Sequence, residues 1–161
     1  MLKPTQRIRN LCFENVCRQF NNHYMCPPYS GSINEIRERL AHYTKGILFQ
    51  YVKPLDVRND SVGLKNTKID FHEKILQLEN TIKLEGACHV WGMIGGNCEL
   101  CEPCKAASKE PCTYPQKART SLESISIDVL SFLQQLGLDN AFHPHKITWT
   151  GCIIYSLHDN F

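Results

Sequence analysis

Residues 95–104 read Gly95-Gly96-Asn97-Cys98-Glu99-Leu100-Cys101-Glu102-Pro103-Cys104, and Cys112 follows shortly afterwards. Three cysteines at three-residue intervals fit neither a packed helix face nor a strand face, because apolar side chains would serve packing better there. Thiolates gathered in one short loop are typical of ligands for an inorganic group. We therefore expect the rest of the chain to hold this cysteine loop, residues 95–112, in place.

The spacing of the loop resembles the C-x2-C-x2-C run that binds an iron–sulfur cluster in bacterial ferredoxins. There a compact loop brings three thiolates onto one cluster, and a remote cysteine supplies the fourth. The preceding pair, Gly95-Gly96, would let backbone amides turn toward the bound group and donate hydrogen bonds to its sulfur atoms. The loop thus predicts an iron–sulfur site.

A second group of cysteines lies near the N-terminus, at Cys12, Cys17 and Cys26. Residues 18–24 between them are polar and follow neither the helical nor the strand period, so we expect a ligand loop. Pro27 after Cys26 removes an amide donor and fixes the chain direction, as at the remote cysteine of ferredoxin motifs. The plainer alternative is three buried, unliganded cysteines.

Length and composition predict one domain over residues 1–161, with a single core. Eighteen basic residues balance sixteen acidic ones for a net charge of +2, so we expect neither nucleic acid nor a membrane surface as a partner. No apolar stretch approaches the roughly 18 residues that span a bilayer, and a cytoplasmic location is expected. Nine cysteines in a reducing compartment favour metal ligands over disulfides.

Capping signals and apolar spacing predict the helices. Ser32 and Glu35 form a capping-box pattern for a first helix, which Gly46 is placed to end. Two shorter helices are expected later, one capped by residues 120–123 and one that opens at Asp128. The longest is expected over residues 67–84, with a cap at Thr67 and Asp70, an inward face of Phe71, Ile75, Leu78 and Ile82, and Gly86 after its end.

Three short runs rich in β-branched and aromatic residues predict strands at 47–52, 87–94 and 147–157. Residues 56–66 are polar and are expected to form a loop. Helices and strands alternate along the chain, so the fold class is α/β or α+β. We expect a small sheet with flanking helices and the cysteine-rich ligand loops at one end.

With these motifs in hand, the sequence resembles an uncharacterised family known as predicted metal-binding proteins, a domain of unknown function. The resemblance covers nearly the whole chain and implies metal binding without a defined reaction. Asn21 stands where the family usually has glycine, and Thr120 where proline is common. The matching motifs are Cys17 with Phe20-Asn21, Cys26-Pro27-Pro28, Gly95-Gly96-Asn97-Cys98, Cys101, Cys104, Cys112, Arg119-Thr120-Ser121-Leu122-Glu123 and Ile127-Asp128-Val129.

Seven cysteines lie in segments that suit ligands, and a protein-bound [4Fe–4S] cluster takes four thiolates. Seven therefore predict two clusters, one bound by four cysteines and one by three. In the simplest division, the cysteine loop binds one cluster and the N-terminal group binds the other. In a crossed division, Cys26 joins the triplet of the loop, and Cys112 joins Cys12 and Cys17. The seven are Cys12, Cys17, Cys26, Cys98, Cys101, Cys104 and Cys112.

A cluster with three cysteines leaves one iron open, and such an iron can bind substrate as a Lewis acid. His23 could close that position, although a solvated loop histidine is the simpler interpretation. Arg119, Ser121 and Glu123 could bind an anionic substrate nearby, although Glu123 also fits a helix cap. Cys88 and Cys152 lie in apolar runs and are expected to be structural.

Three functions remain open from the sequence. The first is an enzyme of sulfur transfer or desulfuration, a sulfurtransferase or lyase, that uses the open iron. The second is a ferredoxin-like electron carrier or redox subunit. The third is an interaction module stapled by zinc, although zinc prefers two separated pairs of ligands to a triplet. The expected partner is a redox or sulfur-donor protein, or a small-molecule substrate.

Overall fold

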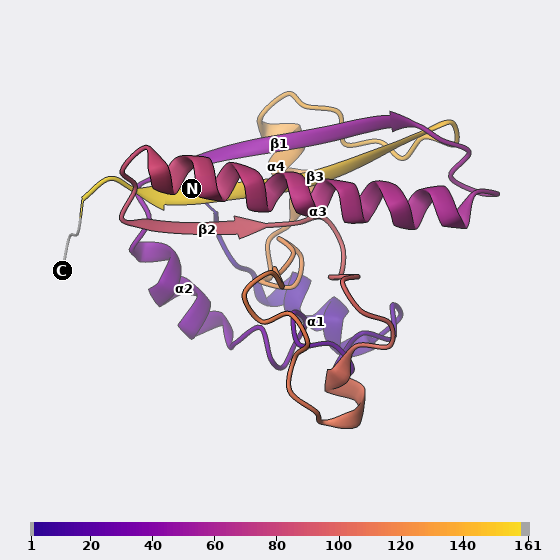
Figure 1. Cartoon of the computed structure of the whole chain (residues 1–161), viewed down its shortest axis with the longest axis horizontal. Coiled ribbons are helices and arrows are strands. Elements are labelled where there is room, and N and C mark those ends of the chain that lie inside the picture. Colours follow the sequence, from indigo (N-terminus) through magenta and orange to yellow (C-terminus); the bar gives the residue numbers. More distant parts are fainter. Residues whose placement is uncertain (1, 159–161) are drawn as a thin grey trace.

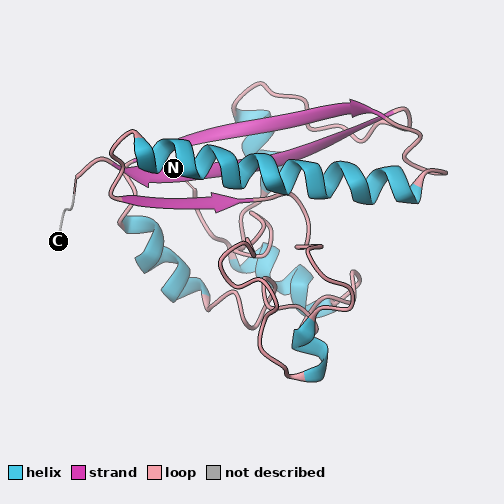
Figure 2. Cartoon of the chain, in the orientation of Figure 1, coloured by secondary structure: helices cyan, strands magenta, loops and turns pink. Residues whose placement is uncertain are grey.

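The computed structural model describes residues 2–158. Within this range the chain forms four α-helices, one short 3-10 helix and three strands (Figures 1 and 2). The predicted mixture of helices with a small sheet is confirmed. In chain order the elements are α1 (Gln6–Glu14), α2 (Ile33–Ala41), β1 (Lys45–Pro54), α3 (Ser61–Leu84), β2 (His89–Met93), η1 (Lys105–Ser108), α4 (Val129–Gln135) and β3 (Lys146–Ser156).

The three strands form an antiparallel sheet in the order β1-β3-β2. Leu48 of β1 pairs with Cys152 of β3, and Met93 of β2 pairs with the same residue from the other side. Successive side chains of a strand point to opposite faces, so Cys152 and Ile154 pack on one face and Ile153 on the other. All three predicted strands are confirmed, with bounds shifted by a few residues.

Helix α3 covers one face of the sheet along its length (Figure 1). Phe71, Ile75 and Ile82 of this helix form a core with Ile153 of β3 and Ile94 after β2. The opposite face packs against Ile36 of α2 and against apolar residues between Leu122 and Phe132. That second core contains Ile36, Trp91, Met93, Leu122, Ile125, Ile127, Cys152 and Ile154, with Val129 and Phe132 of α4 beside it.

Helix α3 is longer than its apolar stripe indicated. It begins at Ser61, where the Asp60 carboxylate accepts a hydrogen bond from the Gly63 amide at 2.7 Å. The predicted loop over residues 56–66 is therefore confirmed only as far as Asp60, its second half is helical, and the predicted cap at Thr67 is wrong. Inside the helix, the Thr67 hydroxyl donates to the Leu64 carbonyl and accepts from the Trp149 indole. Leu78 is partly exposed and does not belong to the buried face.

Two further segments differ from expectation. The helix predicted to be capped by residues 120–123 is absent, because Ser121 and Ser124 exchange side-chain-to-amide hydrogen bonds that close tight turns instead. Near the N-terminus, Cys12 lies in α1, a helix that was not predicted from the sequence. Thr5 caps that helix by accepting from the Ile8 amide. The capping box of Ser32 and Glu35 at the start of α2 is confirmed.

None of the helices within residues 2–158 combines the length and the apolar character needed to cross a lipid bilayer.

Candidate metal centre

Four cysteines of the loop after β2 line one small pocket. Cys98 and Cys101 follow the glycine pair, Cys104 precedes η1 at its N-cap, and Cys112 lies after that helix. His23, Tyr24 and Met25 close the pocket from the N-terminal segment. All nine cysteines of the chain are free thiols, and these four line the same pocket.

Cys98 is the most firmly held of the four. Only 5% of its surface is exposed, and it packs into the core beneath α3. Burial raises the pKa of its thiol, while the backbone N–H groups of Leu100 and Arg119 donate to its sulfur and oppose that shift. The thiols of Cys101 and Cys112 act on it in the same direction as burial. Amide donors aimed at a sulfur ligand favour its thiolate form, which is the form that binds metal.

His23 links the two cysteine segments and is not the solvated loop histidine that the sequence favoured. It is 5% exposed, and its Nε2 donates to the Cys98 carbonyl at 2.7 Å. Its Nδ1 accepts from the Met25 amide at 3.4 Å. Burial lowers the pKa of this imidazole, so the neutral tautomer with a proton on Nε2 is favoured. Because both ring nitrogens have protein partners, His23 orients the loop around Cys98.

Cys12, Cys17 and Cys26 form the second group. Cys12 lies in α1, and the other two lie in the loop that follows it. Burial raises the pKa of Cys26 to about 12, and the nearby thiols of Cys17 and Cys12 add to the shift. Burial also raises the pKa of Cys12, with further contributions from Cys17 and Glu123. The three thiols therefore share one electrostatic environment. Cys104 of the first group also acts on Cys26, so the two groups adjoin.

The loop that carries Cys17 and Cys26 is shaped by asparagines. Asn15 ends α1 in the left-handed conformation, and its side chain accepts from the Phe20 amide at 3.0 Å. Asn21 also has a positive φ, of 58°. Asparagine adopts this conformation more readily than other residues that carry a Cβ, which explains how it occupies a position where glycine is common in the resembling family. The Asn21 amide donates to the Pro27 carbonyl and closes the loop.

A buried lysine binds the loop of the first group. Lys68 of α3 is 8% exposed, and its Nζ donates to Asn97 Oδ1 and to Glu99 Oε1, both at 2.7 Å. Its positive charge lowers the pKa of Cys26. Glu123 is exposed, and desolvation by the neighbouring protein raises the pKa of its carboxyl group; the Ser121 hydroxyl, Lys68 and the Gly96 amide oppose that shift. A cation thus acts electrostatically on Cys26, and a carboxyl group acts on Cys12.

The other two polar candidates bind other parts of the protein. The Arg119 guanidinium forms an ion pair with Glu79 of α3, with Nη2 at 2.5 Å from Oε2. Ser121 exchanges hydrogen bonds with Ser124. Arg119 acts on the site through its backbone N–H, which donates to Cys98. Its side chain anchors the loop to α3.

Within residues 2–158, no three His, Cys, Asp or Glu side chains are arranged to hold a single metal ion. The donor types nevertheless suit a soft metal, because thiols are soft ligands and four of them line one pocket. Cys152 is buried in the core of the sheet, as expected of a structural cysteine. Cys88 lies just before β2 and is exposed, where a buried position was expected.

Sequence reasoning missed the polar residues of α3 that support the site. Lys68, His72 and Glu79 are buried on the same side as Phe71, Ile75 and Ile82. Polar residues at helical spacing on an apolar stripe require buried partners, because an unpaired polar group in a core is costly. That pattern in the sequence could have indicated that these polar side chains have buried partners. The partners, which lie about thirty to forty-five residues away, could not be read from it.

Neither a curated protein nor a solved structure matches this chain. A protein family does match, over residues 1–155, and the matched stretch contains both cysteine groups. Its description states metal binding and specifies no metal. The resemblance that the cysteine and Gly-rich motifs indicated is thereby confirmed: the chain belongs to the family described as "Predicted metal-binding protein (DUF2284)".

Proposed function

We propose that the chain binds iron–sulfur clusters through its seven grouped cysteines, one cluster of the [4Fe–4S] type at each group. The observation that supports this most is the pocket lined by Cys98, Cys101, Cys104 and Cys112. Four thiols are the complete ligand set of one such cluster. Amide donors on Cys98 are the interactions by which proteins tune the potential of a cluster.

The grouping favours the simplest division of the ligands. Cys112 lines the same pocket as the triplet, whereas Cys26 is affected first by burial and then by Cys17 and Cys12. The N-terminal group therefore supplies three thiols to its own cluster. Glu123 lies close enough to Cys12 to raise the pKa of that thiol, so its carboxyl group would lie beside the iron that the three cysteines leave open.

A [4Fe–4S] cluster with one iron free of cysteine supplies Lewis-acid chemistry toward sulfide or a small substrate. The residues around the N-terminal group contribute the rest. Lys68 adds positive charge that favours bound anions, and the Glu123 carboxyl group, with its raised pKa, can hold or release a proton. We propose an enzyme of sulfur transfer or desulfuration. Its partner would be a sulfur-donor or redox protein, or its substrate would be a small molecule.

Metal and sulfide analysis of anaerobically purified protein tests this proposal. Two clusters predict about eight iron and eight acid-labile sulfide per chain, with the brown colour of thiolate-bound iron–sulfur clusters. A colourless protein that contains zinc and lacks sulfide would overturn it. In that case the four thiols of the pocket would be the ligands of a structural zinc site.

One observation supports the electron-carrier alternative. Cys104 of the first group lies near enough to Cys26 of the second to affect its pKa, so the two groups are neighbours. Clusters held that close can exchange electrons. Added sulfide should change the electron paramagnetic resonance spectrum if one iron is open to ligands. An unchanged spectrum would mean that both clusters are closed, and it would favour the electron carrier.

A further inference from the structure

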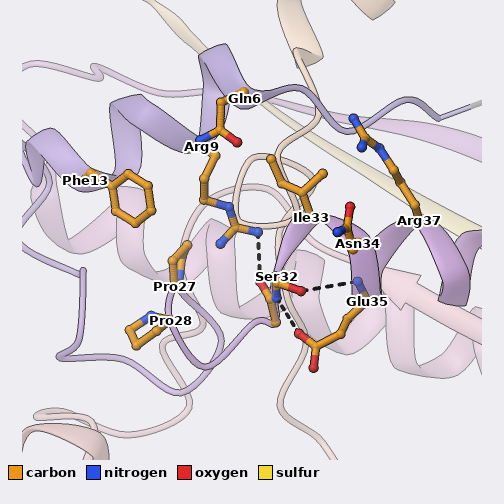
Figure 3. A pocket seen from close by; sticks show the side chains of 11 residues that line it. Gln6, Arg9, Phe13, Pro27, Pro28, Ser32, Ile33, Asn34, Glu35 and Arg37 are labelled. Atoms are coloured by element: carbon orange, nitrogen blue, oxygen red, sulfur yellow. Dashed lines mark hydrogen bonds between the residues drawn. The ribbon is translucent and has the colours of Figure 1, made fainter.

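A cleft of about 740 Å³ lies between α1 and α2, and its lining is distinct from that of the four-cysteine pocket (Figure 3). Arg9 and Phe13 of α1 form one wall, and Pro27 and Pro28 of the loop after Cys26 adjoin them. This volume lies within the range of sites that bind small molecules. None of the functions considered above uses this cleft.

Arg9 is the unusual residue of this cleft. Only 5% of its surface is exposed, and its hydrogen bonds run to neutral oxygen atoms alone: Ser126 Oγ at 2.9 Å, the Gly31 carbonyl at 3.0 Å and Ser30 Oγ at 3.5 Å. In the part of the chain that the structure describes, residues 2–158, no carboxylate forms an ion pair with it. A guanidinium has five N–H donors, so these three bonds leave two unused.

A buried cation without a counter-ion is costly, since it loses hydration without gaining a charged partner. Desolvation accordingly lowers the pKa of Arg9. Its planar fork with two unused donors matches the geometry of a carboxylate. Glu35 also lines the cleft, but its carboxylate accepts from the Ser32 amide at 2.7 Å at the start of α2. Arg37 is a second cation of the lining. The cleft therefore favours an anion.

The wall beside Arg9 is apolar. Phe13 is 55% exposed. Its ring packs edge-on against Phe20, with the two ring centroids 5.4 Å apart. Figure 3 shows the ring next to Pro27, to the left of the Arg9 side chain, whose guanidinium extends toward Ser32. An exposed aromatic ring next to a buried cation suits a ligand that has both an apolar body and a negative group.

We propose that this cleft binds a small organic carboxylate, with its carboxylate on the Arg9 guanidinium and its apolar body on Phe13 and the Pro27-Pro28 segment. The site stands on the cleft and on Arg9, so it does not depend on the metal. The ligand would lie next to the N-terminal cysteine group, because Cys12 interacts with Arg9 and Cys26 precedes Pro27. If that group binds a cluster, the cleft is the place where an organic substrate would approach it.

Calorimetric titration of the purified full chain with 2-naphthoate and with 2-naphthamide tests the site. The two probes share a ring system and differ in charge. A carboxylate on a guanidinium forms charge-assisted hydrogen bonds, so 2-naphthoate should bind about tenfold more tightly than the amide. Equal affinities for the two probes, or no binding of either, would overturn the proposal. Inorganic phosphate should not displace 2-naphthoate at equal concentration, and displacement would show a bare anion site.

Variants separate the two parts of the site. Phe13→Ala removes a largely exposed ring and should weaken 2-naphthoate binding about fivefold, with only a small shift of the unfolding transition from the lost contact with Phe20. Arg9→Lys keeps the positive charge but loses the planar fork, and it should reduce the preference for naphthoate over naphthamide. Arg7→Gln is the matched control, because Arg7 lies on the same helix but pairs with Asp128. If Phe13→Ala binds like the wild type, the apolar wall is not used and the proposal fails.

The outcome is independent of the proposed function. Binding of 2-naphthoate to a protein without iron or sulfide would keep the cleft and reject the clusters. Iron and sulfide in a protein that does not discriminate between the probes would keep the clusters and reject the cleft, and Arg9 would then serve only to balance charge near Cys12.

Discussion

Arg119 binds the buried carboxylate of Glu79 through two nitrogens, with Nη2 2.5 Å from Oε2 and Nε 2.9 Å from Oε1. The same Oε1 accepts the Gly92 amide of β2 at 2.5 Å. The backbone N–H of Arg119 donates to the sulfur of Cys98. One carboxylate thus connects α3, the edge strand β2 and the segment that supports Cys98.

Removing this carboxylate should destabilise the protein. Glu79→Ala leaves a largely buried guanidinium without its partner and an edge-strand amide without its acceptor, so the free energy of unfolding should fall by about 3 kcal/mol. Urea denaturation measures the loss. Glu73→Gln is the control on the same helix, because Glu73 is exposed. A loss equal to that of the control would show that the ion pair contributes nothing.

Gly92 is predicted to resist substitution. A Cβ at this position would lie 2.4 Å from Glu79 Oε1 and 2.8 Å from Ile75 Cγ2, so it would force the carboxylate away from Arg119. Gly92→Ala should therefore cost several times more stability than Gly86→Ala. Gly86 has a positive φ of 97° but open space around it, and alanine there costs only backbone strain of about 1 kcal/mol. Thermal unfolding of the two variants compares them; similar melting temperatures would contradict the packing argument.

His72 should make stability depend on pH. It is 2% exposed and its Nε2 donates to the Lys117 carbonyl at 2.8 Å, and burial lowers its pKa below the ordinary 6.5. The contribution of neutral His72 to the free energy of unfolding is fully present well above pH 6.5. As the pH falls below that value, the unfolded chain takes up the proton first, and stability is lost. The free energy of unfolding should therefore decrease from pH 7 to pH 5.

A substitution isolates this histidine from the others. His72→Gln keeps a donor near the Nε2 position but does not titrate, so its stability should vary less with pH over the same range. His23, whose pKa burial also lowers, accounts for part of what remains. His143→Gln is the control, because this side chain is partly exposed and pairs with Asp139. Parallel pH profiles of His72→Gln and wild type would contradict the assignment.

Metal content should depend on Cys101 and not on Cys88. Cys101→Ser replaces a thiol of the pocket with a weaker ligand for soft metals, and it should remove the metal bound there. Cys88→Ala changes a cysteine outside both groups and should leave the metal content of the purified protein unchanged. Elemental analysis of both variants checks this. Metal loss in Cys88→Ala with retention in Cys101→Ser would show that the ligands have been misassigned.

Local signals predicted most of the secondary structure. The capping box of Ser32 and Glu35 lies within four residues, and the apolar stripe of Phe71, Ile75 and Ile82 repeats at helical spacing, so both were readable. The start of α3 was not. Residues 61–67 show no apolar stripe, and the helix there is supported by Asp60 and by a contact between Thr67 and Trp149, which lies more than eighty residues away.

The sulfur groups were predicted as far as spacing allows. Cys98, Cys101 and Cys104 are close in sequence, so their common pocket was expected. Whether Cys112 or Cys26 joins them depends on the paths of two loops, and spacing gives no preference between the two. His23 illustrates the same point, since its buried bond to the Cys98 carbonyl spans seventy-five residues. Local patterns describe elements, whereas partners across the chain are set by how those elements pack.

Strand β3 lies between β1 and β2, which have no pairing with each other. During translation this central strand emerges after every thiol of both sulfur groups, and Ile153, which packs in the same core as Cys98, emerges with it. A nascent chain on the ribosome therefore carries all its sulfur donors before its sheet can close. The sulfur atoms are therefore accessible before the core is complete. Metal can bind first, and the core can close afterwards.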